Sequence, residues 1–274
     1  MRKNNYPLYF FKKKEVDILA EKIKEIGEKA IKADVEELKK IFPDLLDTIK
    51  DAEVSDYIKV LKESPDLIIR GIPKAGEFIN KSKPDDALPV IRETLPLIFD
   101  KVQKYGLEKF LTEVPDLAKM IPDIFSSMQK LMKEINPDKL TEFGRDFEDI
   151  MKSFFPLVNE GFPIVKKINK DIDDMFNKIK SAKVTTGVNL IDMGWGFRIN
   201  WNNGEITLDS NTESDLTLEL PTKSLFDMFE IMTSGSLSAA LKAFTTGKIK
   251  IKGAMMKGAA ILPLFTELGK LIKR

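Results

Sequence analysis

Few kinds of side chain in this sequence could carry out catalysis, because histidine and cysteine are both absent from its 274 residues. A Ser-His-Asp triad, a histidine general base and a zinc site with histidine or cysteine ligands are therefore excluded. Lysines and paired carboxylates remain as candidate acids, bases or nucleophiles, but no glycine-rich phosphate loop accompanies them. The sequence predicts a protein that is not an enzyme and needs no cofactor or metal; an enzyme subunit is a rival interpretation.

Charge balance and length limit the partners and the architecture. Lysine and arginine total 44 against 43 acidic residues, whereas a protein that binds duplex DNA normally has a marked basic excess. We therefore expect no nucleic-acid partner. A chain of this length can form one large or two ordinary domains with a real core. No run reaches the roughly 18 apolar residues needed to cross a bilayer.

The chemistry that remains is the binding of an apolar ligand, and residues 235–271 contain side chains suited to it. Residues 237–244 have apolar positions at helical spacing. Residues 247–253, GKIKIKG, alternate lysine with isoleucine between two glycines, which predicts a half-buried strand. An apolar helix is predicted from Met255 to Leu268. A helix this apolar must lie against other apolar groups.

Strands that could complete such a site precede this stretch. Between residues 195 and 202, large apolar residues alternate with others that are mostly polar, so one face of this strand is predicted to be buried and the other wet. Residues 206–208 and 216–220 follow the same rule, and a further strand is predicted from Val184 to Asp192. Asn203 and Gly204 suit a tight hairpin. The pattern predicts an antiparallel or mixed sheet with helices on a single face.

In this order, the pieces resemble the sterol carrier protein 2 family of lipid-binding and lipid-transfer domains. The resemblance covers roughly residues 165–273. It rests on GFRINW at 196–201, NGEITL at 203–208, DLTLEL at 215–220, a helix at 223–232, and AFTTGKIKIKG with the apolar helix containing LPLF after it. Ala254 departs from the acidic residue that many members have after the glycine.

The resemblance implies an apolar tunnel between sheet and helices that holds a long-chain lipid: a fatty acid, an acyl-CoA, a sterol or an isoprenoid. The residues expected to line it are Trp195, Phe197, Ile199, Leu218, Phe226, Phe229, Met232, Leu241, Phe244, Ile251, Met255, Met256, Leu262, Phe265 and Leu268. The spacing of these residues is by itself also compatible with a solid core, where methionine fills irregular gaps.

The first half of the chain follows a different pattern. From Val16 to Ile179, apolar residues recur at alternating steps of three and four, and charged residues fill the faces between them. This predicts amphipathic helices that pack along narrow seams. Such seams could also join copies of the chain. The alternative to lipid binding is therefore a structural protein whose helices form a homo-oligomer beside a passive C-terminal domain.

Prolines punctuate these helices in a repeated arrangement. Pairs spaced seven residues apart, each proline directly after an apolar residue, occur at 89 and 96, 115 and 122, and 156 and 163. The first of each pair fits the first turn of a helix, whereas the second must kink the helix or restart it. We predict that Pro96, Pro122 and Pro163 bend helices in a bundle; amphipathic helices lying on lipid are the alternative.

The first fourteen residues combine aromatic and basic side chains, with too short an apolar run for a signal peptide. Aromatic rings at headgroup depth and lysines on anionic lipid would anchor the chain at a membrane surface. The residues predicted to make this contact are Tyr6, Tyr9, Phe10, Phe11, Lys12, Lys13 and Lys14. The alternative is an arm that docks its aromatic residues on the folded body.

Taken together, these features predict an α+β protein with a helical region at residues 1–164 and a sterol-carrier-like domain at residues 165–274. The predicted function is non-catalytic lipid binding, with transfer of lipid between membranes as its extension. A cytoplasmic protein that visits membrane surfaces fits this prediction, since the C-terminal residues LIKR are not a peroxisomal signal.

Overall fold

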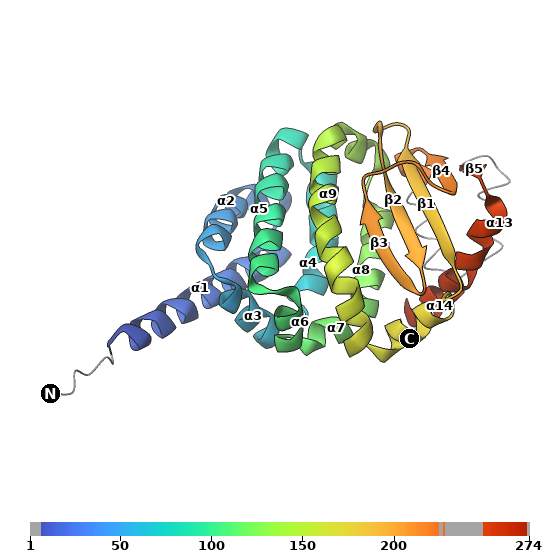
Figure 1. The fold of residues 1–274 in the computed structure, drawn as a ribbon. Helices are drawn as coiled ribbons and strands as arrows, with labels where there is room; N and C mark the ends of the chain where they lie inside the picture. Colours follow the sequence, from blue (N-terminus) through green and yellow to red (C-terminus); the bar gives the residue numbers. More distant parts are fainter. Residues whose placement is uncertain (1–6, 225–226, 228–248, 273–274) are drawn as a thin grey trace.

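The computed structural model describes residues 7–224, 227 and 249–272 of the chain, and it has the mixed α+β class expected from the sequence (Figure 1). Helices fill the first part of the chain. They are α1 (Pro7–Lys32), α2 (Val35–Asp51), α3 (Val54–Glu63), α4 (Leu67–Lys81), α5 (Pro84–Tyr105), α6 (Leu107–Glu113), α7 (Pro115–Lys119), α8 (Ile121–Glu134), α9 (Pro137–Ile168) and α10 (Lys170–Asn177). None of the described helices is both long and apolar enough to span a bilayer.

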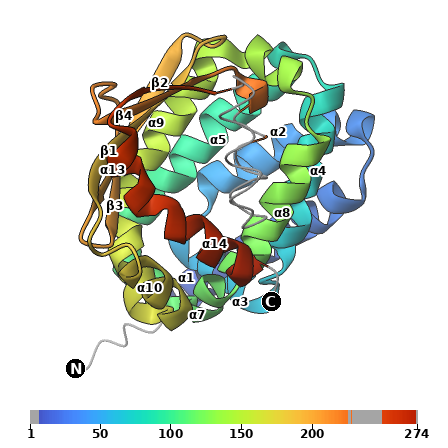
Figure 2. The same ribbon diagram turned by 90° about the vertical axis from the view of Figure 1, so that its right-hand side faces the viewer.

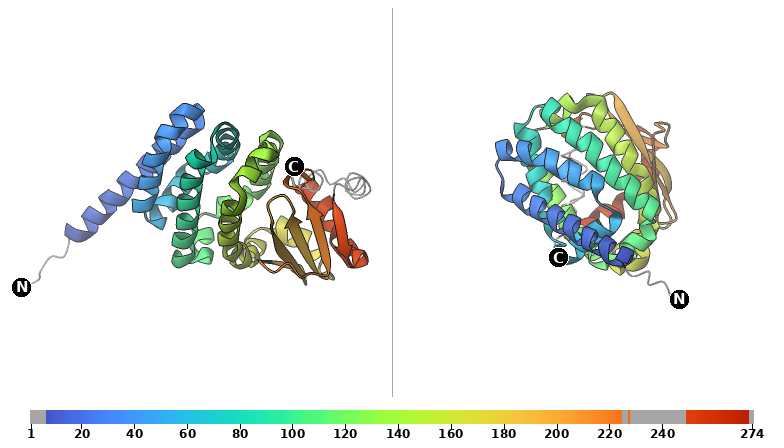
Figure 3. Two further views of the ribbon diagram at one scale, coloured as in Figure 1. Left: turned by 90° about the horizontal axis from the view of Figure 1, so that it is seen from above. Right: turned by 90° about the vertical axis from the view of Figure 1, so that its left-hand side faces the viewer.

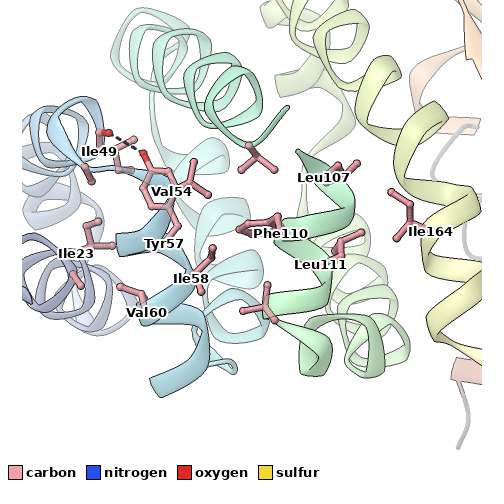
Figure 4. Packing of buried hydrophobic residues seen from close by; sticks show 14 residues of the cluster. Ile23, Ile49, Val54, Tyr57, Ile58, Val60, Leu107, Phe110, Leu111 and Ile164 are labelled. Carbon is pink, nitrogen blue, oxygen red and sulfur yellow. Dashed lines mark hydrogen bonds between the residues drawn. The ribbon is translucent and has the colours of Figure 1, made fainter. Parts of the chain in front are cut away.

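The core of the helical part forms where short helices fit between long ones. Tyr57 of α3 and Phe110 of α6 are both buried in one apolar cluster, which Ile164 of α9 also joins (Figure 4). The Tyr57 hydroxyl donates to the carbonyl oxygen of Ile49 at 2.8 Å, so this buried polar group is satisfied. Burying one large apolar side chain contributes about 1.5 to 3 kcal/mol, and this cluster joins α1, α2, α3, α5, α6 and α9.

The prolines have two structural roles. Pro115 and Pro122 lie in the first turns of α7 and α8, where the missing N–H costs nothing. The prediction that Pro122 bends a helix is therefore wrong, because the chain restarts there. Pro163 lies inside α9 as expected, and Pro96 falls within α5. Pro156 also lies inside α9, and Pro89 lies beyond the first turn of α5, so the expectation that the first proline of each pair begins a helix is wrong for these two.

The sheet has the strand order β3-β2-β1-β4-β5. Its strands are β1 (Lys183–Leu190), β2 (Trp195–Asn202), β3 (Glu205–Asp209), β4 (Leu216–Leu220) and β5 (Lys250–Gly253). β1 pairs antiparallel with β2 and parallel with β4, so the sheet is mixed. The predicted hairpin joins β2 to β3 through Asn203 and Gly204, which both have positive φ, as a two-residue type I′ turn requires.

Cross-strand register places the apolar residues of all five strands on one face. Leu190 lies opposite Trp195 and Leu220, and Val188 lies opposite Phe197 and Leu218. The other face is polar. There Arg198 donates to Asp209 from Nε and Nη2 at 3.1 and 2.9 Å. The alternation in the sequence thus predicted both faces of the sheet.

Helix α9 joins the helical part to the sheet. It runs without interruption through the predicted domain boundary at residues 164 and 165 and lies between α5 and β3 (Figure 1). Lys166, near its end, is only 9 % exposed and donates to the carbonyl of Gly204 at 2.9 Å and to Glu205 at 2.7 Å. The two predicted regions therefore share an extensive contact.

The first turns of α1 extend away from the body of the protein. Toward the N-terminus, α1 extends beyond α2 and α3 (Figures 1 and 3). Farther along the helix, Ala20, Ile23 and Ile26 are buried. The predicted membrane-contact residues 9–14 lie in the extended turns of α1, and Tyr6 lies outside the described residues.

Candidate functional site

The candidate site is the apolar face of the sheet, which carries two separate clusters of buried side chains. The first, the Trp201 cluster, contains Val184 and Trp201 from the sheet together with Phe176 of α10 and Leu264 of α14 (Leu262–Ile272). The indole N–H of Trp201 donates to the hydroxyl oxygen of Thr186 at 3.2 Å. The described side chains of this half of the face pack as a buried core.

The second cluster, the Trp195 cluster, lies at the other end of the same face. Its buried members are Val188, Leu190, Met193, Trp195, Leu216, Leu218, Leu220 and Ile249. Among the described helices, α9 brings apolar side chains to it. Met151 packs against the cluster, and the ring of Phe155 lies 6.1 Å from that of Phe197 between centroids.

Several predicted lining residues meet at this cluster. Trp195 and Leu218 are buried within it, Phe197 and Ile251 are half-buried against it, and Ile199 lies on the same face, against the Trp201 cluster. Of the helical residues, Met255 belongs to α13 (Met255–Gly258) and Leu262, Phe265 and Leu268 to α14. Phe226, Phe229, Met232, Leu241 and Phe244 lie outside the described residues.

Two groups of residues differ from the sequence interpretation. Met256 is 87 % exposed, so it belongs to the surface rather than to an interior wall. Met151 and Phe155 of α9 were not among the predicted lining residues, although they approach the face. The sequence around Met151 and Phe155 predicted an amphipathic helix that contains prolines. That pattern does not specify which other element the apolar side of the helix packs against.

A polar clamp on the opposite face fixes the turn that leads from the sheet into α13. The Asp215 carboxylate accepts from the Lys257 ammonium at 2.7 Å and from the Thr185 N–H at 3.0 Å. Lys257, and then the Thr185 N–H, lower the pKa of Asp215 from 3.8 to about 2. The Asp215 carbonyl also accepts from the Ala254 N–H at 2.7 Å. This clamp sets where α13 begins.

A second clamp lies at the end of the sheet that carries the Trp195 cluster. The carboxylate of Asp192, in the turn between β1 and β2, accepts from the N–H and the hydroxyl of Thr222 at 2.9 Å each. The N–H of Ile191 donates to the carbonyl of Leu220 at 3.1 Å. The chain that leaves β4 is therefore held at the rim of the apolar face, while the Ile191 side chain remains 60 % exposed.

The apolar face contains no evident reacting group among its described residues. The buried carboxylate of Asp56 belongs to the start of α3, where burial raises its pKa, and buried Lys166 serves the contact between α9 and the β2–β3 turn. No group of three or more possible metal ligands occurs within the described ranges. The described side chains of this face are suited to packing against hydrocarbon.

Comparison with known proteins adds little to this geometry. No family model and no curated protein matches the chain. Among solved structures, the stereoselective inverting sec-alkylsulfatase Pisa1 from Pseudomonas sp. matches at 12 % identity and a TM-score of 0.27, over 80 % of this chain and 30 % of that one. A double mutant of the same sulfatase gives 13 % identity and the same TM-score, over 76 % and 31 %. This chain spans about a third of those chains, and similarity at this level assigns neither fold nor activity.

Proposed function

We propose that the protein binds a long-chain lipid without catalysis, with the hydrocarbon against the Trp195 cluster. The observation that carries this proposal is a continuous cluster of buried apolar side chains across four strands, met on the helix side by Met151 and Phe155. Methionine repacks around irregular shapes at small cost. The resemblance of residues 165–273 to sterol carrier protein 2 domains supports the same ligand class.

Hydrocarbon burial can supply the affinity that such a site needs. Each CH₂ group removed from water contributes about 0.8 kcal/mol. Ten of them would contribute roughly 8 kcal/mol before the cost of ordering the chain and the protein is subtracted. A site of this kind needs few polar contacts, in agreement with the apolar character of the face.

The two tryptophans allow the proposal to be tested at the level of the cluster. The sequence contains only Trp195 and Trp201, and they belong to different clusters. In Trp201→Phe the emission comes from Trp195 alone, and in Trp195→Phe from Trp201 alone. Addition of palmitate should change the emission of Trp201→Phe and leave that of Trp195→Phe nearly constant, because the proposed site lies at the Trp195 cluster.

The same titration can contradict the proposal. If palmitate changes the emission of neither variant and does not raise the thermal midpoint of the unaltered protein, the apolar face does not bind the chain, since a ligand of the folded state must stabilise it. A response confined to Trp201 would move the site to the other end of the sheet.

Exchange of lipid with a bilayer would require contact with the membrane, and α1 supplies a candidate. Its first turn contains no acidic residue, and the sequence FFKKK at residues 10–14 places two aromatic residues before three lysines. Aromatic residues next to lysines suit the interface of an anionic bilayer. We propose that these turns, which the ribbon shows extending from the body (Figure 3), bring the protein to the membrane surface.

A further inference from the structure

Helix α1 packs on the body of the protein along one side. Ala20, Ile23 and Ile26 are buried on this side, and Ala20 and Ile23 belong to the apolar cluster of the helical part. The helix contacts α2, α3 and α4. These contacts fix how α1 is rotated about its own axis, so each of its other sides has a defined direction relative to the body.

Ile18 lies on the opposite side of α1. It comes five residues before Ile23, and an α-helix turns by about 100° per residue, so the two positions lie roughly 140° apart around the helix axis. The Ile18 side chain is 63 % exposed. A single exposed isoleucine is ordinary in a folded protein, but this one continues a pattern in the turns that precede it.

Positions 11 and 14 fall on the same side of α1 as Ile18. They precede it by seven and four residues, which is the spacing of neighbours along one side of a helix. Phe11, Lys14 and Ile18 therefore form an outer stripe, which begins in the turns that extend beyond α2 and α3 (Figures 1 and 3). An aromatic, a basic and an aliphatic residue in line suit the interface of an anionic bilayer.

Acidic residues mark where the outer stripe ends. Glu21 and Glu25 follow Ile18 by three and seven residues on the same side of the helix, and both are exposed. Anionic lipid repels carboxylates, whereas it attracts lysine. The part of this side that can meet an anionic surface therefore ends at Ile18, two helical turns or about 10 Å after Phe11.

We propose that α1 lies lengthwise on an anionic bilayer, with the outer stripe at the interface and the body of the protein on the side away from the lipid. This inference rests on the membrane contact proposed above. It adds Ile18 to that contact and fixes an orientation, because Ile23 holds the opposite side of α1 against the body. A second copy of the chain fits the stripe less well, since the lysines at residues 12–14 would add positive charge from both copies.

Two exposed isoleucines allow a matched test. Ile18→Asp places a carboxylate in the outer stripe, and Ile191→Asp places one on the turn between β1 and β2, where Ile191 is 60 % exposed. That turn belongs to the sheet, which lies at the opposite end of the molecule from the first turns of α1 (Figures 1 and 2). In sedimentation with vesicles of phosphatidylglycerol and phosphatidylcholine, Ile18→Asp should lower the partition coefficient roughly tenfold, since most of the burial of one isoleucine is lost. Ile191→Asp should bind as the unaltered protein does.

A dye at the same two positions reports the contact itself. The sequence contains no cysteine, so Ile18→Cys and Ile191→Cys can each be labelled at a single site with a nitrobenzoxadiazole dye, whose emission rises in an apolar environment. Addition of the same vesicles should raise the emission of the dye at residue 18 and shift it to shorter wavelength. The dye at residue 191 should not respond.

The outcomes separate this inference from the membrane contact on which it rests. If the unaltered protein sediments with the vesicles, but either Ile18→Asp binds as well as Ile191→Asp or the dye at residue 18 does not respond, the contact does not include Ile18 and the inference is wrong, while the membrane contact stands. If the unaltered protein does not sediment, both are wrong. If the emission of the dye at residue 18 rises with protein concentration in the absence of vesicles, a second copy covers the stripe, which also overturns the inference.

Discussion

The side chain of Asn159 in α9 pairs with the backbone of Leu208 in β3 in both directions. Its amide nitrogen donates to the Leu208 carbonyl at 2.9 Å, and its amide oxygen accepts from the Leu208 N–H at 2.7 Å. A carboxamide thus takes the place that a neighbouring strand would occupy at the edge of the sheet. This pairing protects an edge strand that could otherwise recruit another chain and fastens the helical part to the sheet.

Replacing Asn159 should therefore destabilise the protein as a whole. Asn159→Ala leaves a partly buried donor and acceptor unpaired, which typically costs about 1 to 3 kcal/mol. Urea unfolding followed by tryptophan emission and by far-ultraviolet circular dichroism should show one shared transition at lower urea. Asn177→Ala removes an exposed amide that bonds within α10 and should change stability little. Separate transitions for sheet and helices in the unaltered protein would contradict the coupling.

The clamp at Asp215 should make stability depend on acid pH. Because the pKa of Asp215 is about 2 in the folded protein against an ordinary 3.8, its contribution is fully present above the ordinary value and is lost as pH falls toward 2. Compared with Asp215→Asn, the unaltered protein should be more stable at neutral pH, and the difference should shrink between pH 4 and 2, roughly the interval between the two pKa values. A difference that stays constant over this range would exclude the depressed pKa.

Lys257→Met provides the companion variant for this titration. It removes the first cause of the shift while leaving the Thr185 N–H in place, so the pKa of Asp215 should rise toward 3.8. Carboxyl carbon chemical shifts in a nuclear magnetic resonance titration would measure the change directly. An unaltered titration midpoint would show that the backbone amide alone holds the carboxylate.

Two glycines with positive φ allow the cost of backbone strain alone to be compared with the cost of strain plus a steric clash. Gly253 has φ of 94° and Gly194 has φ of 72°. A Cβ atom at Gly253 would lie 2.2 Å from the carbonyl oxygen of Asp215, whereas one at Gly194 would meet nothing within 4 Å. Gly194→Ala should cost about 1 to 2 kcal/mol, the usual penalty for a left-handed residue. Chemical denaturation should show a distinctly larger loss for Gly253→Ala; equal losses would mean that the turn adjusts freely.

The first turns of α1 can be tested with vesicles. Deletion of residues 1–14 should reduce sedimentation with vesicles that contain phosphatidylglycerol, and added salt should weaken the binding of the full chain, because exposed charges are screened within about 10 Å at 0.1 M salt. Replacing Lys12, Lys13 and Lys14 with glutamate keeps the length of the helix and should reduce binding in the same way. Equal sedimentation of all three proteins at low salt would show that α1 does not contribute to membrane binding.

Local pattern predicted much of this fold, and long-range contact decided the rest. Alternation in residues 195–202 predicted both faces of β2, and Asn203-Gly204 predicted the hairpin, because parity and positive φ are properties of a short segment. The contact of Asn159 with Leu208 joins positions far apart in sequence, so no local pattern could reveal it. The outcomes of Pro122, which begins α8, and Met256, which is exposed, likewise depended on neighbours that spacing does not specify.

Native mass spectrometry after incubation with palmitate tests lipid binding at the apolar face most directly. Phe197→Asp places a charge on that face, and Thr207→Asp places the same charge on the exposed polar face of β3. The unaltered protein and Thr207→Asp should carry a mass increase equal to bound lipid, and folded Phe197→Asp should lack it, because an unpaired charge placed against hydrocarbon is costly. Lipid retained equally by Phe197→Asp, or absent from all three proteins, would contradict binding at this face.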